Sequence, residues 1–527
     1  MALKSFFLPQ RCSLRNRSSL PAVTAKVALL LALGLFTQTP ARAVVKLPCL
    51  FSHNMVLQQG MPVPVWGWAD EGELVTVQFQ GQRGQSKTKD GKWKVVFKNL
   101  RAGGPDVLTV DGRNRIQLDN IMVGEVWICS GQSNMQWPMT QAFDPQADIL
   151  NSDNPNLRLF TVERTKSDQP LEDLKQPWNV GKYAWQPASK QSVPDFSAVA
   201  YYFGRELQKA LKVPVGLIHT SWGGSPAEVW MSQPALEANN QYKLDIVASY
   251  LVAHSKYTEA KAKYDQEAAE AKKAGKDPGP APKPPGWKPA ELYNGMIHPL
   301  IPYAIKGAIW YQGESNAGRA HQYRTLFPDM IKNWRKDWGQ GDFTFLAVQL
   351  APFMKIKDQP GESSWAELRE AQLLATKTAK IGLAVITDLG EENDIHPKKK
   401  APVGERLALA ARGLAYGEKI EYSGPVYKNL KMKKNEPIVS FDHTGQGLEA
   451  RGGELKGFSI CGADRKFVWG KAEIVGNTVV VTSPEVEKPV AVRFGWADYP
   501  VVNLWNKDGL PASPFRTDDF PMTTAPK

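Results

Sequence analysis

Residues 121–135, IMVGEVWICSGQSNM, join an apolar run to an abrupt polar turn. Val126 and Ile128 lie in a run of apolar residues with the length of a buried strand. Gly131 then allows a tight exit that leaves Ser133 just beyond the strand. Open α/β sheets bind their ligands at the carboxyl edge of the strands. The stretch therefore predicts a buried strand that presents a candidate nucleophile at the ligand-binding edge of a sheet.

Apolar strands alternate with amphipathic helices after Ser133. Such alternation predicts an α/β fold with a parallel, doubly wound sheet that helices cover on both faces. The predicted strands are 157–162, 213–219, 306–311, 343–350 and 381–387, and the predicted helices are 196–211, 321–338, 364–379 and 403–416. We assign this α/β domain to residues 120–418.

Short alternating runs flank the α/β domain on both sides. Runs such as PVPVWGWA and KWKVVF, broken by Gly and Asp turns, predict an antiparallel β domain over residues 44–119. Similar runs return late in the chain and predict a C-terminal β region over 419–527. Inside the α/β domain, residues 256–289 hold a charged helical run and a proline-rich return, a composition typical of a solvated excursion from the domain surface.

The first 43 residues have the features of a signal peptide. Basic residues without any acid precede the apolar segment 27–36, and Ala41-Arg42-Ala43 has the form of a cleavage site. The apolar segment is too short to cross a hydrocarbon layer of ~30 Å. The sequence therefore predicts an exported protein, periplasmic or secreted, with no membrane span once the signal peptide is removed.

The charge and the cysteine count exclude two further classes of protein. Removal of the signal peptide lowers the formal net charge from +12 to +6, because that segment holds six Lys or Arg and no acid. So small a surplus gives no reason to expect nucleic acid as a partner. Cys49, Cys129 and Cys461 remain, an odd number that excludes a disulfide framework but leaves room for a Cys49–Cys461 bridge.

Four loops with small or polar residues follow four of the predicted strands. They are SGQSN at 130–134, SWGGS at 221–225, QGESN at 312–316 and DLGEENDIHP at 388–397. Each loop alone is an ordinary turn, but parallel strands bring all four to one edge of the sheet. A serine nucleophile needs a base and an oxyanion site, and these loops hold candidates for both.

The fourth loop supplies the partners that Ser133 would need as a nucleophile. His396 is the predicted base, which accepts the Ser133 proton and returns it to the leaving alcohol. Asp394 is the candidate acid that orients the imidazole. In an extended loop, side chains two residues apart point to opposite sides, so Asp388 or a backbone carbonyl is the alternative.

The remaining roles fall to the first three loops. The predicted oxyanion donors are the backbone N–H of Ser133, a backbone N–H of Gly223 or Gly224, and the side-chain amide of Asn316. The predicted substrate contacts in these loops are Gln132, Trp222, Gln312 and Glu314.

Several long strings carry a family resemblance over nearly the whole chain after the signal peptide. They are LFSHNMVLQQGMPVPVWGWA, GEVWICSGQSNM, GLIHTSWGGSPAEVW, LYNGMIHPLIPYAIKGAIWYQGESNA, DIHPKKK and NKDGLPASPFRTDDF. With them the chain resembles the sialate O-acetylesterase group of the SGNH hydrolase superfamily. The resemblance implies a flavodoxin-like α/β/α hydrolase domain with flanking β domains, no metal and no organic cofactor.

The same resemblance implies roles for individual residues. It makes Ser133 the nucleophile, His396 the base, and Asn316 with a glycine of the GGS loop the oxyanion donors. The superfamily's usual acid lies three residues before the histidine, where this chain has Asn393. A Ser–His dyad is therefore the alternative to a triad.

We expect an esterase that removes O-acetyl groups from a sialic acid or an acetylated polysaccharide through an acetyl-enzyme on Ser133. The alternatives are an inactive carbohydrate-binding protein and a glycosidase in which Glu314 pairs with Asp394 or Glu391. The glycosidase leaves Ser133 unexplained. We expect His298 to be structural and the lysines at 398–400 to be a solvated helix start.

Overall fold

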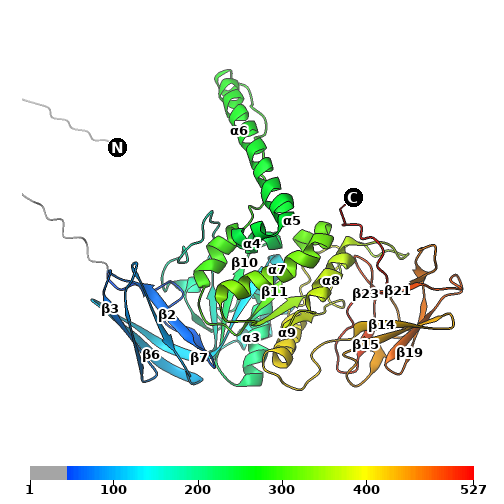
Figure 1. The fold of residues 1–527 in the computed structure, drawn as a ribbon, viewed down its shortest axis with the longest axis horizontal. Helices are drawn as coiled ribbons and strands as arrows, with labels where there is room; N and C mark the ends of the chain where they lie inside the picture. The colour runs from blue at the N-terminus through cyan, green and yellow to red at the C-terminus, as the bar shows by residue number, and fades with distance from the viewer. Residues whose placement is uncertain (1–43, 527) are drawn as a thin grey trace, which may run out of the picture. The chain divides into compact units, whose positions relative to one another are not determined.

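A largely parallel sheet forms the centre of the structure, with the strand order β13-β12-β11-β7-β10-β8-β9 (Figure 1). The computed structural model describes residues 44–526, so the predicted signal peptide lies outside the described residues. The strands are β7 (Arg115–Gly131), β8 (Asn154–Thr161), β10 (Val215–Ser221), β11 (Gly307–Tyr311), β12 (Thr344–Val348) and β13 (Ile381–Ala384), with β9 (Gln186–Ala188) as an antiparallel edge. The α/β fold class predicted from the sequence is confirmed.

The chain changes direction across this sheet at β7. Strands β8 and β10 lie on one side of β7, and β11, β12 and β13 follow in chain order on the other. Gly131, the last residue of β7, is in register with Ser221 of β10 and with Tyr311 of β11. The carboxyl ends of three strands therefore meet at a topological switch point, where open α/β sheets bind ligands.

Helices cover both faces of the central sheet (Figure 1). The helix α3 (Ala198–Leu211) packs against α9 (Ala401–Leu414), and α7 (Ala320–Trp338) packs against α8 (Ser364–Ala375). Along β7, Trp127 and Cys129 belong to the core that contains α3 and α9, whereas Val126 and Ile128 belong to the core that contains α7 and α8. The strand is apolar on both faces because each face fills a different core.

Residues 44–119 form largely antiparallel β structure that continues into the central sheet, and one short strand, Val56–Gln58, pairs in parallel with β7. The first part of β7 pairs with β6 (Gly103–Asp111), and its last part pairs with β10 and β11. The other strands here are β1 (Val56–Gln58), β2 (Val63–Trp68), β3 (Leu74–Phe79), β4 (Gln82–Lys87) and β5 (Lys92–Phe97). One strand thus belongs to both the N-terminal β structure and the central sheet.

The chain after α9 forms antiparallel sheets with a core of their own. One has the order β14-β15-β20-β19 and another β18-β17-β21-β23, and β16 pairs with β22. Their bounds are β14 (Val426–Lys433), β15 (Glu436–Asp442), β16 (Leu448–Ala450), β17 (Phe458–Cys461), β18 (Val468–Trp469), β19 (Lys471–Val475), β20 (Thr478–Thr482), β21 (Ala491–Phe494), β22 (Leu504–Asn506) and β23 (Phe515–Arg516). Cys461 in β17 and Cys49 are both free, buried thiols. The Cys49–Cys461 bridge that the cysteine count allowed is therefore absent.

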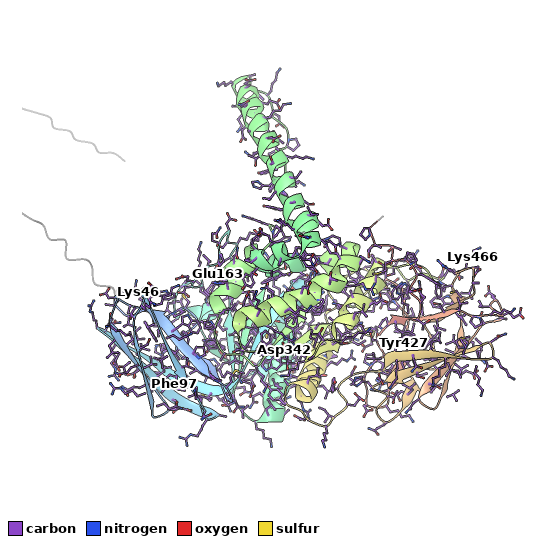
Figure 2. All side chains as sticks on the ribbon, in the orientation of Figure 1. Lys46, Phe97, Glu163, Asp342, Tyr427 and Lys466 are labelled. Atoms are coloured by element: carbon purple, nitrogen blue, oxygen red, sulfur yellow. The ribbon has the colours of Figure 1, made fainter. Side chains whose placement is uncertain are left out.

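The charged excursion forms the helix α6 (Ser249–Lys273), which extends away from the central sheet (Figure 1). Its side chains stand free in solvent along most of its length (Figure 2), and Ala268 is the one buried residue of the helix. The helix begins earlier than the predicted residue 256, after a π-helical stretch at Lys243–Ala248. Among residues 44–526, none of the helices combines the length and the apolar character needed to cross a membrane.

Short helices fill the connections between these elements. They are α1 (Ser133–Gln136), α2 (Gln146–Leu150), α4 (Gln233–Ala238), α5 (Asn240–Tyr242), η1 (Met139–Gln141), η2 (Gly181–Tyr183), η3 (Ala227–Trp230), η5 (Tyr293–Ile297), η6 (His298–Leu300) and η7 (Glu314–Arg319). Two of them, α1 and η7, follow the ends of β7 and β11 and carry residues of the candidate site.

Candidate active site

Ser133 begins α1 at the carboxyl end of β7. Gly131, just before it, has φ +139°, and a Cβ at this position would collide with the carbonyl of Tyr311. The backbone N–H of Gln132 donates to that same carbonyl over 3.0 Å. The turn is therefore locked to β11 by its backbone, and the partly exposed Ser133 hydroxyl lies at the sheet edge.

His396 approaches Ser133 from a part of the chain far away in sequence. Its Nε2 atom lies 2.8 Å from the Ser133 Oγ. The Asp394 Oδ1 accepts a hydrogen bond from the backbone N–H of His396 over 2.9 Å and lies 3.5 Å from its Nδ1. Hydroxyl, imidazole and carboxylate are thus in line, with a longer contact between the last two groups.

The position of Asp394 follows from a turn in its loop. Glu391 and Asp394 form a β-bridge, and the backbone bends at Ile395 and His396, so the chain is not extended between Asp394 and His396. Asp394 therefore lies on the same side as His396, unlike two residues at this spacing in an extended loop. Asp388, the alternative acid, instead makes two hydrogen bonds to Arg406 over 2.7 and 2.8 Å. Asp394 is therefore the carboxylate available to His396.

The histidine loop, residues 385–397, crosses the ends of β12 and β11 to reach Ser133, because β13 is not a neighbour of β7. Side chains and backbone from elsewhere hold it there. The Tyr499 hydroxyl donates to the Gly390 carbonyl over 3.1 Å, and the Ile356 N–H donates to the Glu392 carboxylate over 2.8 Å. The C-terminal β region and the loop between β12 and α8, which holds Ile356, thus both contribute to the placement of the base.

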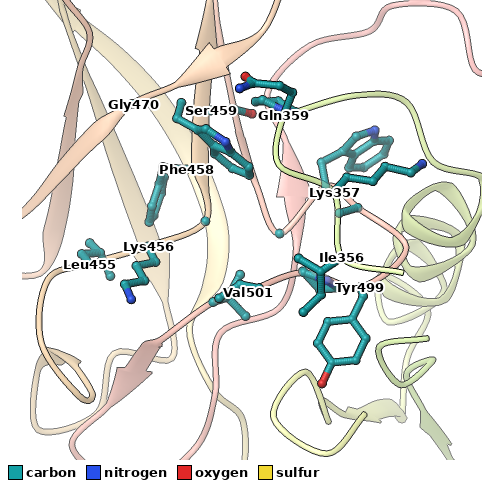
Figure 3. Close-up of a pocket in the computed structure, with 18 residues that line it drawn as sticks. Ile356, Lys357, Gln359, Leu455, Lys456, Phe458, Ser459, Gly470, Tyr499 and Val501 are labelled. Carbon is teal, nitrogen blue, oxygen red and sulfur yellow. The ribbon is translucent and has the colours of Figure 1, made fainter. Parts of the chain in front are cut away.

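A cavity of about 310 Å³ lies beside these supports (Figure 3). Ile356 and Tyr499 line it together with Phe458, Trp469 and Val501. Neither Ser133 nor His396 lies in its wall. The cavity is therefore separate from the hydroxyl and the imidazole.

The side-chain amide of Asn316, a predicted oxyanion donor, is held rigidly. Its Nδ2 donates to the Glu228 carboxylate over 3.0 Å, and its Oδ1 accepts from the Ala227 N–H over 2.9 Å. The bond to Glu228 uses one of the two Nδ2 hydrogens. The neighbouring Ser315 N–H donates to the Gln132 side chain over 3.3 Å, which ties this loop to the nucleophile turn.

Gly223, from the second predicted loop, lies directly beside the nucleophile. A Cβ at Gly223 would lie 3.3 Å from the Ser133 Cβ. Its N–H donates to the Gln136 Oε1 over 2.9 Å, so in this structure the predicted oxyanion donor is occupied by a side chain of α1. Gly224 follows with φ +76° in open space.

Three of the four predicted substrate contacts form hydrogen bonds within and between the loops of the site. Gln132 and Gln312 are buried, and Gln312 bonds to the Asn316 Oδ1 over 2.6 Å and to the Tyr323 hydroxyl over 2.9 Å. Glu314 accepts from the Asn134 amide over 2.6 Å, and its other oxygen is buried. These hydrogen bonds hold the loops of the site against one another.

Trp222 is the predicted substrate contact that remains partly exposed. Its ring meets the ring of Trp287 edge to face, with centroids 5.4 Å apart. The Lys166 Nζ lies 4.3 Å from the centre of the Trp287 ring. Because Trp287 lies in the proline-rich return of the excursion, this segment contributes to an aromatic wall next to the GGS loop.

Three residues outside the predicted site, Trp137, Asn134 and Lys400, lie around His396. Trp137 stacks on the imidazole, with centroids 5.1 Å apart and planes 20° apart. Asn134 donates to the carbonyl of Ile395 over 3.1 Å. Lys400 is 1% exposed, so the expectation of a solvated helix start is wrong for this lysine. Position in the sequence could have pointed to two of them, because Asn134 directly follows Ser133 and Lys400 ends the basic run after His396.

Burial and charge set the protonation of the central groups. Burial lowers the pKa of His396, the charge of Lys400 lowers it further, and Asp394 acts in the opposite direction. The imidazole is therefore neutral at neutral pH and able to accept a proton. Burial also lowers the pKa of Lys400 to about 7 and raises the pKa of Glu314.

Two other histidines are held in structural hydrogen bonds. The His298 Nδ1 lies 2.8 Å from the Leu171 carbonyl oxygen, in agreement with a structural role. The His219 Nε2 lies 2.7 Å from the Ser221 Oγ. Burial lowers the pKa of His219 to about 3, so this second Ser–His pair stays neutral.

Comparison with known proteins identifies the family of the chain. Residues 123–267 and 284–412 match the family described as carbohydrate esterase, sialic acid-specific acetylesterase. The chain is 28% identical to the sialate O-acetylesterase of Homo sapiens, over 93% of this chain and 95% of that protein. It is 30% identical to the sialate O-acetylesterase of Mus musculus, over 88% of this chain and 92% of that protein. The crystal structure of a carbohydrate acetylesterase from Xanthomonas citri matches with a TM-score of 0.78 and 39% identity, over 90% of this chain and 100% of that chain. The chain therefore belongs to the sialic acid-specific acetylesterase family of carbohydrate esterases.

Proposed function

We propose that this protein is an exported serine esterase that removes O-acetyl groups from sugars through an acetyl-enzyme on Ser133. The observation that carries the proposal is the 2.8 Å contact between the Ser133 Oγ and the His396 Nε2. This contact lies at the switch point of the sheet, where a ligand can reach both groups. Export rests on the signal-peptide features of the first 43 residues.

Acylation needs the neutral imidazole. The Ser133 Oγ adds to the acetyl carbonyl carbon while the His396 Nε2 takes the hydroxyl proton. When the tetrahedral intermediate collapses, the bond between the carbonyl carbon and the sugar oxygen breaks, and His396 gives the proton to that oxygen. The deacetylated sugar leaves, and the acetyl group stays on Ser133.

Deacylation repeats these steps with water in the place of the sugar hydroxyl. His396 takes a proton from water as its oxygen adds to the acetyl carbonyl carbon, and the same proton returns to the Ser133 Oγ as acetic acid leaves. Asp394 orients the imidazole and stabilises its cationic form. Its contact with the imidazole is long, 3.5 Å, so its contribution is smaller than that of a carboxylate at full hydrogen-bond distance.

The oxyanion in this proposal is met by the Ser133 N–H, the free Nδ2 hydrogen of Asn316 and a glycine N–H of the GGS loop. Glu228 supports this role of Asn316, because it accepts one Nδ2 hydrogen and so fixes the orientation of the amide. The Gly223 N–H becomes available when the oxyanion takes the place of the Gln136 Oε1. Because preorganised donors cost no rearrangement in the transition state, loss of the Asn316 amide should cost about 10²-fold or more in kcat.

The substrate we propose is an O-acetylated sugar, a sialic acid or an acetylated polysaccharide. Matched relatives carry the names sialate O-acetylesterase and carbohydrate acetylesterase. The partly exposed Trp222, backed by Trp287, supplies an aromatic face beside Ser133 on which a sugar ring can pack. A glycosidase gains no support, because both oxygens of the Glu314 carboxylate are withdrawn from the site.

Turnover of p-nitrophenyl acetate by the full chain and by Ser133→Ala tests the proposal. The parent should hydrolyse the ester and the variant should not. Equal turnover by both proteins would overturn the assignment of Ser133, and no turnover by either would favour an inactive carbohydrate-binding protein. Product analysis on O-acetylated sialic acid beside acetylated xylan then identifies the sugar, and release of reducing sugar would favour the glycosidase.

A further inference from the structure

The side chain of Asn134 bridges the nucleophile turn and the histidine loop. Its Nδ2 donates to the Glu314 Oε1 over 2.6 Å and to the Ile395 carbonyl over 3.1 Å. Its Oδ1 accepts from the Lys400 Nζ over 2.5 Å. Asn134 follows Ser133 directly and Ile395 precedes His396, so this one amide joins the neighbours of both reacting groups.

The partners of Asn134 allow only one orientation of its amide. An ammonium group has donors and no acceptor, whereas a carboxylate and a carbonyl oxygen only accept. The Oδ1 must therefore face Lys400, and the Nδ2 must face Glu314 and Ile395. Without the ammonium, the buried Oδ1 of Asn134 would lose its donor, and the amide could flip away from the Ile395 carbonyl.

Lys400 reaches His396 by a second route. Its Nζ lies 5.6 Å from the centre of the Trp137 ring, and Trp137 stacks on the imidazole of His396. On another side the Nζ lies 5.3 Å from the centre of the Tyr311 ring, whose backbone carbonyl fixes the nucleophile turn. A cation over an aromatic face is attractive, and more so when it is removed from water. Lys400 thus contacts the groups that hold both His396 and Ser133.

We propose that Lys400 is a positioning residue of this esterase, whose ammonium holds Asn134 and Trp137 so that His396 stays aligned with Ser133. The proposal rests on the proposed function, because it concerns the same Ser133–His396 pair. It assigns a catalytic consequence to one lysine of the run at 398–400. Lys398 and Lys399 are exposed and have no part in it.

The charge of Lys400 gives the proposal an electrostatic signature. After burial, Lys400 is the main cause of the lowered pKa of His396, and Asp394 opposes it. The carboxylates that act on Lys400 itself are those of Glu314, Asp394 and Glu391. Removal of the Lys400 charge leaves burial as the remaining cause that lowers the pKa of His396 against the effect of Asp394, so this pKa must rise. A lysine that only filled space would leave this pKa unchanged.

The variant Lys400→Met tests both effects, with Lys399→Met as its matched control. We expect the plateau of the pH profile, the maximal kcat/KM for p-nitrophenyl acetate, to fall about 10- to 100-fold in Lys400→Met, the loss typical of a misplaced catalytic group. We also expect the acid limb of its pH profile to move to higher pH. Lys399→Met removes a charge from the same run without touching Asn134, and it should keep the parent profile.

The variant Lys400→Gln separates positioning from charge and serves if the methionine variant does not fold. Glutamine keeps an N–H donor for Asn134 but carries no charge. We expect a smaller loss at the plateau and an upward shift of the acid limb. The rate at which a fluorophosphonate labels Ser133, followed over the same pH range, should show the same shift without the deacylation step.

Two results would overturn the proposal. One is a plateau kcat/KM of both Lys400 variants within twofold of Lys399→Met. The other is an acid limb that stays in place in both. Failure of the proposed function is distinguishable, since it would appear as activity that survives Ser133→Ala in the parent background.

Discussion

The nucleophile turn and the histidine loop reach the same point in different ways. The turn at Gly131–Gln132 is fixed by backbone: a register position in β7, a glycine with φ +139° and a hydrogen bond to the Tyr311 carbonyl. The histidine loop crosses two strand ends and is fixed largely by side chains, from Asn134, Glu392 and Tyr499. The fold therefore places the nucleophile, whereas distributed contacts place the base.

The strongest test of this contrast is to break the turn itself. Gly131→Ala would force a Cβ into the Tyr311 carbonyl at a φ that disfavours side chains, so we expect a loss of several kcal/mol of stability or no folded protein. Gly339→Ala is the control, because Gly339 also has a positive φ but no atom lies within 4 Å of its Cβ position. Thermal unfolding measures both. Equal, small losses would mean that the turn tolerates distortion.

Removal of the base should stop catalysis and leave the fold intact. We expect His396→Ala to lower kcat for p-nitrophenyl acetate by about 10⁴-fold, since a serine without its base is a weak nucleophile. His298→Ala, which removes a structural histidine, should lower stability but keep most of kcat. The opposite pattern in the two variants would show that His298, and not His396, is the base.

The acid member should matter less than the base. Because the Asp394 Oδ1 lies 3.5 Å from the His396 Nδ1, we expect Asp394→Asn to lower kcat only about 10-fold. Asp394 raises the pKa of His396, so its removal should move the acid limb of kcat/KM to lower pH, opposite to the Lys400 variants. Measurement of the profiles of both variants in one buffer series checks the sign. A loss near that of His396→Ala would show that the long contact shortens during catalysis.

Remote support of the histidine loop should have the smallest effect. Tyr499→Phe removes the hydroxyl that donates to the Gly390 carbonyl, so we expect about 1 kcal/mol of lost stability and a loss of a few-fold in kcat. Thermal unfolding and steady-state kinetics provide both numbers. If kcat falls while KM and stability stay unchanged, this contact affects the alignment of the histidine loop for catalysis and not its stability.

The fold was largely predictable because its signals are local. Apolar runs that end in small polar loops indicated the strands, and the parallel order followed from their alternation with helices. The structure reproduces the predicted strands and helices with ends shifted by a few residues, most clearly at the end of α8. The family resemblance rests on long sequence motifs, and the prediction from hydrophobic periodicity does not depend on them.

The site was predictable only for reactive residues that lie in a polar loop directly after an apolar strand. Ser133 and His396 are brought together as predicted, since each sits in a polar loop after an apolar strand. The environment of Lys400 could not be derived, because its burial depends on neighbours such as Asn134, which is 266 residues away in sequence. The same holds for Asp394, whose approach to His396 depends on a turn that spacing does not reveal.

The 17-residue strand β7 also affects the proteolysis and the thermal unfolding of the protein. Residue 120, where the sequence placed a domain boundary, lies inside this strand, so no flexible hinge separates the N-terminal β structure from the nucleophile. A protease has no exposed linker to cut at that point, and a fragment that starts at residue 120 would begin in mid-strand with unpaired backbone groups. Heating should therefore melt the two regions in a single cooperative step.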